Sequence, residues 1–112
     1  PNRYLGGAIA IGPQTAADAL AQRTAKLPRI DLTPPKAAVG KNTLEALRSG
    51  LVLGYAALVE GMVRRFKEEA GEALVIATGG FAETLRPLCP CVDVVDEDLT
   101  LKGLLRIHLE RG

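Results

Sequence analysis

The sequence predicts an α/β domain that contains one long helix. Short apolar segments typical of buried strands alternate along the chain with segments of helical periodicity, which is typical of a layered α/β arrangement. Between Thr43 and Ala70 apolar residues recur every three or four positions, which predicts a helix of about 42 Å at 1.5 Å per residue. With 112 residues, 47% of them hydrophobic, the chain has the size of one domain and can bury a core.

The charge balance argues against a nucleic-acid partner, and the length of the apolar runs argues against a membrane span. The formal net charge is +1, with 14 basic and 13 acidic residues, so no basic surface for nucleic acid is expected. No uninterrupted apolar run reaches the roughly 20 residues of a membrane span, and no secretory signal pattern is present. We therefore expect a cytoplasmic protein that binds neither nucleic acid nor a membrane.

The first 40 residues are expected to form a strand, a helix and a connector. The segment LGGAIAIG (residues 5–12) is typical of a short buried strand, in which Gly6 and Gly7 allow another backbone to approach closely. Residues 13–27 suit an amphipathic helix that begins at Pro13. Residues 28–40 hold three prolines and are expected to be extended.

A Gly-Lys-Asn-Thr sequence (residues 40–43) lies where the long helix begins. It is not a phosphate-binding P-loop, because Pro35 replaces the first glycine of that motif and Asn42 separates Lys41 from Thr43. Asn42 followed by Glu45 is instead the signature of a capping box. If Asn42 is the cap, the Thr43 hydroxyl is left to meet another group.

The long helix also carries a stripe of small residues. These residues follow one another at spacings of four, three and four, and are Gly50, Gly54, Ala57 and Gly61. Each glycine inside a helix costs about 0.5–1 kcal/mol relative to alanine, so several together indicate that another backbone comes close. Tight packing within one domain and a subunit interface both fit this pattern.

The last 40 residues predict a strand, a glycine turn, a helix, a strand and a second helix. The apolar run ALVIA (residues 73–77) predicts a buried strand, followed by Thr78, Gly79 and Gly80 and by helical character in residues 81–88. CVDVVD (residues 91–96) alternates like a short strand. The remaining segment, 98–112, predicts an amphipathic helix capped by Asp98, with Leu101, Leu104, Leu105 and Leu109 on its apolar face.

The Thr78-Gly79-Gly80 turn is the best candidate for a ligand site. Small residues allow a ligand to lie on the backbone, and a following helix offers unpaired N–H groups to an anion, although many such turns use glycine for geometry alone.

The other candidate ligand residues are better explained by structure. The acidic cluster of Asp93, Asp96, Glu97 and Asp98 could bind a cation but fits a solvated loop better. Cys89 and Cys91 flank Pro90 and are expected to be reduced thiols, since a metal site would need two further ligands. His108, the single histidine, is expected to pack or face solvent.

Four motifs occur together in an order that resembles the C-terminal half of type III pantothenate kinases. They are YLGGAIAIG, VGKNTLEALRSG, VIATGG and VDEDLTLKGL, and the similarity spans nearly all of residues 1–112. The resemblance implies a ribonuclease-H-like, actin-like ATPase domain that works as a homodimer, for which the long helix is the expected interface. It also implies transfer of the γ-phosphoryl group of ATP to the hydroxyl of pantothenate, the first step of coenzyme A biosynthesis, with Mg²⁺ and a monovalent cation (K⁺ or NH₄⁺).

The resemblance also implies roles for individual residues. The threonine of the GKNT motif, Thr43, would contact pantothenate. The Thr78-Gly79-Gly80 turn would lie on the nucleotide side of the cleft, and Gly6 and Gly7 are assigned to that side as well. Ile11 stands where the family usually has a proline, so the loop after the strand is expected to be looser.

The family's phosphate-binding loop, catalytic aspartate and Asp-x-Gly-Thr motif all precede the equivalent of Pro1. We therefore expect an N-terminal ATPase half outside this chain, no catalytic residue within it, and no kinase activity for it alone. Two alternatives remain: a non-catalytic dimerisation or regulatory module, and a related small-molecule kinase with another acceptor.

Overall fold

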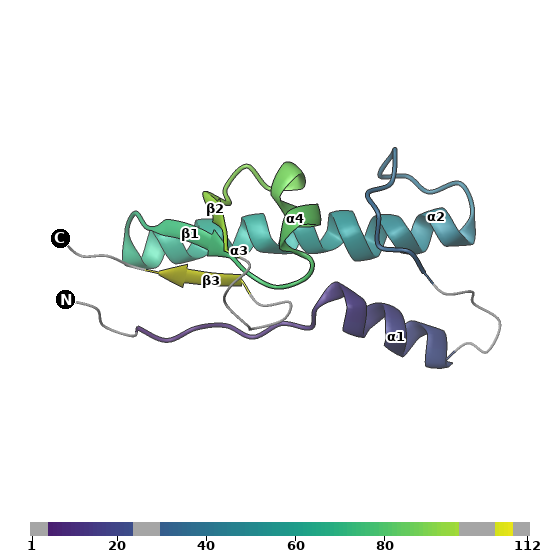
Figure 1. Ribbon diagram of the computed structural model, residues 1–112, viewed down its shortest axis with the longest axis horizontal. Coiled ribbons are helices and arrows are strands. Elements are labelled where there is room, and N and C mark those ends of the chain that lie inside the picture. The colour runs from purple at the N-terminus through teal and green to yellow at the C-terminus, as the bar shows by residue number, and fades with distance from the viewer. Residues whose placement is uncertain (1–4, 24–29, 97–104, 109–112) are drawn as a thin grey trace.

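One long helix runs along most of the molecule, and the other helices and the sheet lie beside it. The computed structural model describes residues 5–23 and 30–96, and the backbone of 105–108 (Figure 1). The molecule is elongated, with extents of 52 × 25 × 22 Å. The helix comprises α2 (Thr43–Arg48), the π-helical turn η1 (Ser49–Leu53) and α3 (Gly54–Ala70). The predicted long helix is thus confirmed, whereas the π turn within it was not predicted.

A small mixed sheet lies against α3. Its strands are β1 (Leu74–Ala77), β2 (Val94–Val95) and β3 (Leu105–His108), in the order β2-β1-β3. β1 pairs with β2 in parallel and with β3 in antiparallel orientation. Between β1 and β2 the chain forms the short helix α4 (Ala82–Leu85) and the 3₁₀ turn η2 (Arg86–Leu88). The predicted strand at 73–77 is therefore confirmed, and the one at 91–96 is confirmed only for Val94–Val95.

The larger buried cluster joins α3, β1 and the α4 region. Alternate residues of β1, Val75 and Ala77, are buried, as period-2 alternation requires of a strand with one face on a core. They pack with Val59 and Val63 of α3 and with Leu85 of α4. The apolar face of α3 is therefore covered by the sheet and by α4.

A second, smaller cluster lies at the other end of the long helix. There α1 (Pro13–Arg23) runs beside the helix, as Figure 1 shows, and buries Ala17 against Leu51 of η1 and Ile30. α1 begins at Pro13 as predicted, and its expected continuation through residue 27 lies outside the described residues. Residues 30–40 contain no helix or strand, as expected of the connector, and residues 28 and 29 lie outside the described residues.

Residues 5–12 are not the buried strand that the sequence predicts. They are extended without strand pairing, residues 5–11 are exposed, and the Ile9 side chain is 94% exposed. An extended segment becomes a strand only when a neighbouring strand accepts and donates its backbone hydrogen bonds. In the described part of the chain the β1 edges are already taken by β2 and β3, which leaves the segment without a partner.

The predicted helix over 98–112 is wrong where the structure describes it. Residues 105–108 form β3, in which Val75 pairs with Ile107 and Ile76 with Arg106. Local apolar spacing fits a helix there, but the free edge of β1 offers a ladder of backbone hydrogen bonds, and this tertiary pairing overrides local propensity. The predicted Asp98 cap, and Leu101, Leu104 and Leu109, lie outside the described residues.

The long helix, Thr43–Ala70, has 28 residues and is long and apolar enough to cross a membrane, judged by length and composition alone. Only 22% of its most apolar stretch is buried within the molecule, although Val59 and Val63 are buried beneath the sheet. A single helix of this kind is weak evidence for a membrane span, because core helices of soluble proteins can have the same length and composition. The expectation of no membrane segment was based on uninterrupted apolar runs and overlooked this helix.

Candidate functional site

The entrance of the long helix is capped as the sequence predicts. Asn42 has extended backbone angles (φ −148°, ψ 171°), and its side-chain oxygen accepts a hydrogen bond of 2.9 Å from the Glu45 N–H. The reciprocal half of the predicted capping box is wrong. The Glu45 carboxylate instead forms an ion pair of 2.8 Å with Arg48, one turn further along the helix. Thr43, the first helical residue, is exposed, so its hydroxyl can be reached from solvent.

Gly40 permits a close approach between the connector and the first turn of α2. A Cβ atom at this position would lie 2.3 Å from the Ala46 backbone nitrogen and 2.5 Å from the Ala46 Cα. No real Cβ contact is that short, and a backbone atom cannot rotate away as a side chain can. The glycine of the GKNT sequence therefore has a steric function in this structure.

Two side chains of the helix hold the connector in place. Arg48 Nε donates to the Asp31 carbonyl at 3.1 Å, and the Ser49 hydroxyl donates to the Ala38 carbonyl. Because both acceptors are backbone atoms, these contacts fix the path of the connector. Neither residue was singled out by sequence reasoning, since a bond to a backbone carbonyl leaves no sequence signature in the acceptor.

The Thr78-Gly79-Gly80 turn follows β1 as predicted. Gly79 has φ of +106°, a conformation that favours glycine, and the Ala82 N–H donates to its carbonyl at 3.2 Å. Gly80 is exposed and has open space where a Cβ would lie. Thr78 is only 3% exposed. The following helix α4 has four residues, which is too short for the strong positive end expected from the sequence.

Asp93 has a structural function that sequence reasoning missed. Its Oδ2 accepts a hydrogen bond of 2.8 Å from the Val75 N–H at the start of β1, and its own N–H donates to the Val75 carbonyl at 2.9 Å. The Asp96 N–H likewise donates to the Ala77 carbonyl. These two aspartates therefore extend the contact between β1 and β2, while Glu97 and Asp98 lie outside the described residues.

The two cysteines are free thiols, as predicted. Cys89 is fully buried and donates to the Ala56 carbonyl at 3.4 Å, and burial raises its pKa to about 12. Burial also raises the pKa of Cys91, which lines an open groove of about 400 Å³ with Glu60, Val63, Arg64, Lys67, Glu68 and Glu72. Among the described residues no three His, Cys, Asp or Glu side chains are grouped so as to bind a metal ion.

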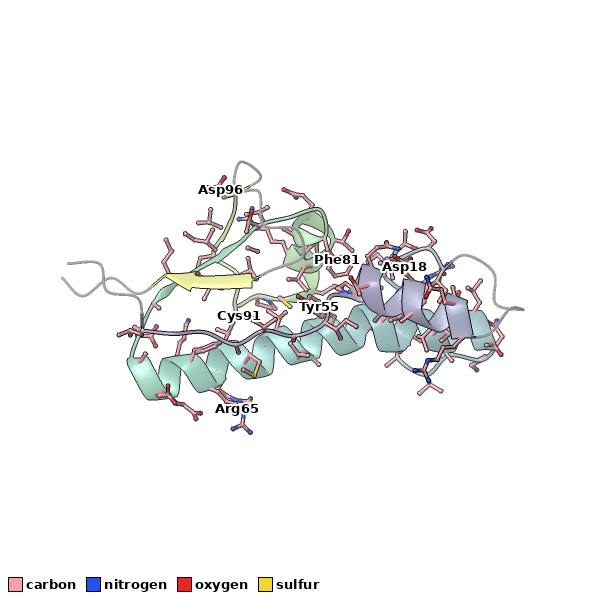
Figure 2. All side chains as sticks on the ribbon, turned by 90° about the horizontal axis from the view of Figure 1, so that it is seen from below. Asp18, Tyr55, Arg65, Phe81, Cys91 and Asp96 are labelled. Carbon is pink, nitrogen blue, oxygen red and sulfur yellow. The ribbon has the colours of Figure 1, made fainter. Side chains whose placement is uncertain are left out.

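The structure does not bring Thr43 and the Thr78 turn together. Phe81, directly after the turn, contacts Tyr55 of α3 with ring centroids 5.8 Å apart (Figure 2). Tyr55 follows Thr43 by twelve residues, which corresponds to about 18 Å along a helix. The other two candidates, Gly6 and Gly7, lie in the exposed extended segment before α1, with φ of +122° at Gly6. Any shared site would therefore extend lengthwise along the helix.

The small residues of the stripe face open space. Apart from the helix's own backbone nearby, no atom of the described structure lies within 4 Å of a Cβ built at Gly50, Gly54 or Gly61. Packing among the described residues therefore does not explain the stripe. Leu58, next to this stripe, is 41% exposed.

Comparison with known proteins identifies a family. A profile described as type III pantothenate kinase matches residues 1–65. A type III pantothenate kinase from one strain of Thermus thermophilus is 99% identical over all 112 residues of this chain, and its counterpart from a second strain is 98% identical. A type III pantothenate kinase of Deinococcus radiodurans is 53% identical over 98% of this chain. This chain spans 44%, 44% and 42% of the lengths of these three relatives.

Proposed function

Since this chain belongs to the type III pantothenate kinase family, we propose that it forms the C-terminal domain of an ATP-dependent kinase that phosphorylates pantothenate. The product would be 4′-phosphopantothenate, and the reaction the first step of coenzyme A biosynthesis. The observation that carries this proposal is the 99% identity to a type III pantothenate kinase over the whole chain. By this proposal residues 1–112 are one domain of an actin-like, ribonuclease-H-like fold in a cytoplasmic enzyme. The mixed sheet beside a long helix is compatible with that fold class.

Thr43 is the proposed contact for the acceptor substrate. It is exposed at the first position of α2, and the Glu45 N–H of that first turn is already satisfied by Asn42. A hydroxyl that has no capping function can donate to, or accept from, the polar groups of pantothenate. Binding and orienting the acceptor are thus the contribution of this end of the helix.

The Thr78-Gly79-Gly80 turn is the proposed contact for the nucleotide. Gly80 is exposed and has no side chain, so a ligand can lie directly on its backbone. The Thr78 side chain is buried, so its proposed contribution is to support the turn rather than to touch ATP. Gly6 and Gly7, in an exposed segment, would offer further backbone surface to the nucleotide side.

The Mg²⁺ and the K⁺ or NH₄⁺ of the proposed reaction are not assigned to the described residues. Mg²⁺ in phosphoryl transfer is bound by carboxylates together with the substrate phosphates, and no three His, Cys, Asp or Glu side chains are grouped in the described part of the chain. By this proposal the catalytic residues belong to the N-terminal half of the kinase, so this chain by itself is expected to show no kinase activity.

The test of the acceptor site is Thr43→Ala in the full-length kinase. Loss of one hydrogen bond of about 1 kcal/mol should raise KM for pantothenate about fivefold and leave KM for ATP unchanged. Thr43→Ser, which keeps the hydroxyl, is the matched control and should behave like wild type. An unchanged KM for pantothenate in Thr43→Ala would refute the acceptor assignment.

The stripe of the long helix supports a second proposal, that two copies associate through Gly54, Ala57 and Gly61. These residues leave a smooth surface on which a second helix can lie closely, and the space that a Cβ would occupy at Gly54 and Gly61 is open in the described chain. Sedimentation of wild type should show a dimer, and Gly54→Leu should shift it towards monomer. A dimer that persists unchanged in Gly54→Leu would contradict this interface. Association without any effect on catalysis would favour a dimerisation or regulatory module.

A further inference from the structure

The connector and the π turn of the long helix are joined by hydrogen bonds at Ser49. Its hydroxyl donates to the Ala38 carbonyl in the connector. Its own carbonyl accepts from the Gly54 N–H, five residues further along, which is the hydrogen bond that makes this turn a π turn. One residue thus fastens the connector on one side and closes the irregular turn on the other.

Arg48 holds the same connector at a second point. Its Nε donates to the Asp31 carbonyl at 3.1 Å while its Nη1 pairs with Glu45 at 2.8 Å, and its side chain is only 19% exposed. The ion pair fixes the guanidinium group, so less side-chain entropy is lost when it bonds to the connector. Asp31 and Ala38 are seven residues apart, so the two anchors enclose most of the connector.

An apolar contact and a steric contact complete this attachment. Ile30 is buried with Ala17 and Leu51, and Leu32 packs against the same cluster. At the other end of the connector, Gly40 lies directly against the Ala46 backbone. The connector therefore has a defined path from Ile30 to the helix entrance at Thr43, although it contains neither helix nor strand.

We propose that Arg48 and Ser49 are positioning residues for the acceptor site. They hold the connector at a fixed place beside Thr43, so that the connector and the first turn of α2 form the two walls against which the acceptor lies. This inference rests on the proposed contact between Thr43 and pantothenate. Neither side chain touches the substrate in this scheme, and both act through the backbone of residues 31–38.

The first test is limited proteolysis of the full-length kinase, without substrate, by a protease that cleaves after lysine. Lys36 is exposed and lies between the two anchors, so the rate of cleavage at the Lys36–Ala37 bond reports how often the connector leaves the helix. Ser49→Ala should speed this cleavage about fivefold, and Arg48→Met about tenfold, because the second change removes a charged donor. Ser49→Thr keeps the hydroxyl and should restore protection. Arg65→Met is the matched control, because Arg65 is exposed on α3 and points away from the rest of the molecule in Figure 2.

The second test is the Michaelis constant for each substrate in the same variants. Ser49→Ala and Arg48→Met should raise KM for pantothenate about three- to tenfold, while KM for ATP and kcat stay near wild type. An unchanged cleavage rate at Lys36 in both variants would overturn the attachment itself. Faster cleavage with an unchanged KM for pantothenate would overturn the positioning role.

Thr43→Ala, measured in the same assay, separates the two proposals. If Thr43→Ala leaves KM for pantothenate unchanged, the acceptor assignment fails, and the cleavage rates at Lys36 still decide whether the connector is attached. If Thr43→Ala raises KM and Ser49→Ala does not, the acceptor assignment stands and the positioning role is overturned. A raised KM in both, restored by Ser49→Thr, supports both proposals.

Discussion

The Tyr55 ring meets the Phe81 ring edge to face, with centroids 5.8 Å apart and an interplanar angle of 77°. Tyr55 belongs to α3, and Phe81 directly follows the Thr78-Gly79-Gly80 turn. This pair therefore joins the candidate nucleotide turn to the long helix. Both rings pack against the larger buried cluster, and burial raises the pKa of Tyr55.

A double-mutant cycle measures that contact. Phe81→Leu and Tyr55→Leu should each destabilise the fold, and their effects should be non-additive by about 0.5–1.5 kcal/mol, the value of an edge-to-face pair beyond area burial. Urea denaturation of wild type, the two single variants and the double variant provides the four free energies. Additive effects would show that the rings contribute only through separate burial.

Asn42→Ala should lower the free energy of unfolding by about 1 kcal/mol, because the Glu45 N–H loses its cap. Asn42→Asp keeps an acceptor oxygen and adds a negative charge at the helix N-terminus, so it should match or exceed wild type. Equal denaturation midpoints for Asn42→Ala and wild type would contradict the assigned cap.

Gly40→Ala should destabilise the chain by about 1–3 kcal/mol, because its methyl group would overlap the Ala46 backbone. Gly80→Ala is the matched control, since its methyl group would enter open space. Thermal unfolding of the two variants should therefore differ clearly. If Gly40→Ala unfolds at the wild-type temperature, the close approach of connector and helix is absent in solution.

The buried Cys89 thiol should make stability fall at alkaline pH. Its pKa is raised from 9.0 to about 12 by burial, so the neutral thiol stabilises the fold fully below pH 9, and this contribution is lost as pH rises towards 12. The decline is at most about 1.4 kcal/mol per pH unit. Cys89→Ala removes the ionisable group. The difference in free energy of unfolding between wild type and Cys89→Ala should therefore decrease between about pH 9 and about pH 10.5. Denaturation midpoints measured across this pH range check this, and a constant difference would contradict it.

Local sequence patterns correctly predicted the elements that are stabilised by nearby residues or by burial of one apolar face. Apolar spacing predicted the helix between Thr43 and Ala70, and Asn42 predicted its start. The same reasoning failed where a distant partner decides the structure. Residues 105–108 carry helix-like spacing but pair with β1, and residues 5–12 carry strand-like composition but find no edge in the described chain.

In the candidate site, too, local features were predicted from the sequence and contacts between distant segments were not. Glycines at 79 and 80 predicted the turn, because positive φ requires glycine at position 79. The burial of Thr78 and the hydrogen bond from Val75 to Asp93 depend on packing between segments far apart in sequence. The π turn at Ser49–Leu53 escaped prediction for a similar reason, since Ser49 is held by the Ala38 carbonyl and not by a local sequence signal.

The long helix contributes to both buried clusters of the molecule, and the change from one to the other follows the π turn. Leu51, in that turn, belongs to the cluster with α1, whereas Ala56, beyond it, belongs to the cluster with the sheet. A helix that contributes to two buried clusters and contains a less stable π turn need not unfold along its whole length at once. We expect two cooperative units within a single helix, in which the end bearing Thr43 opens and closes independently of the end that supports the sheet.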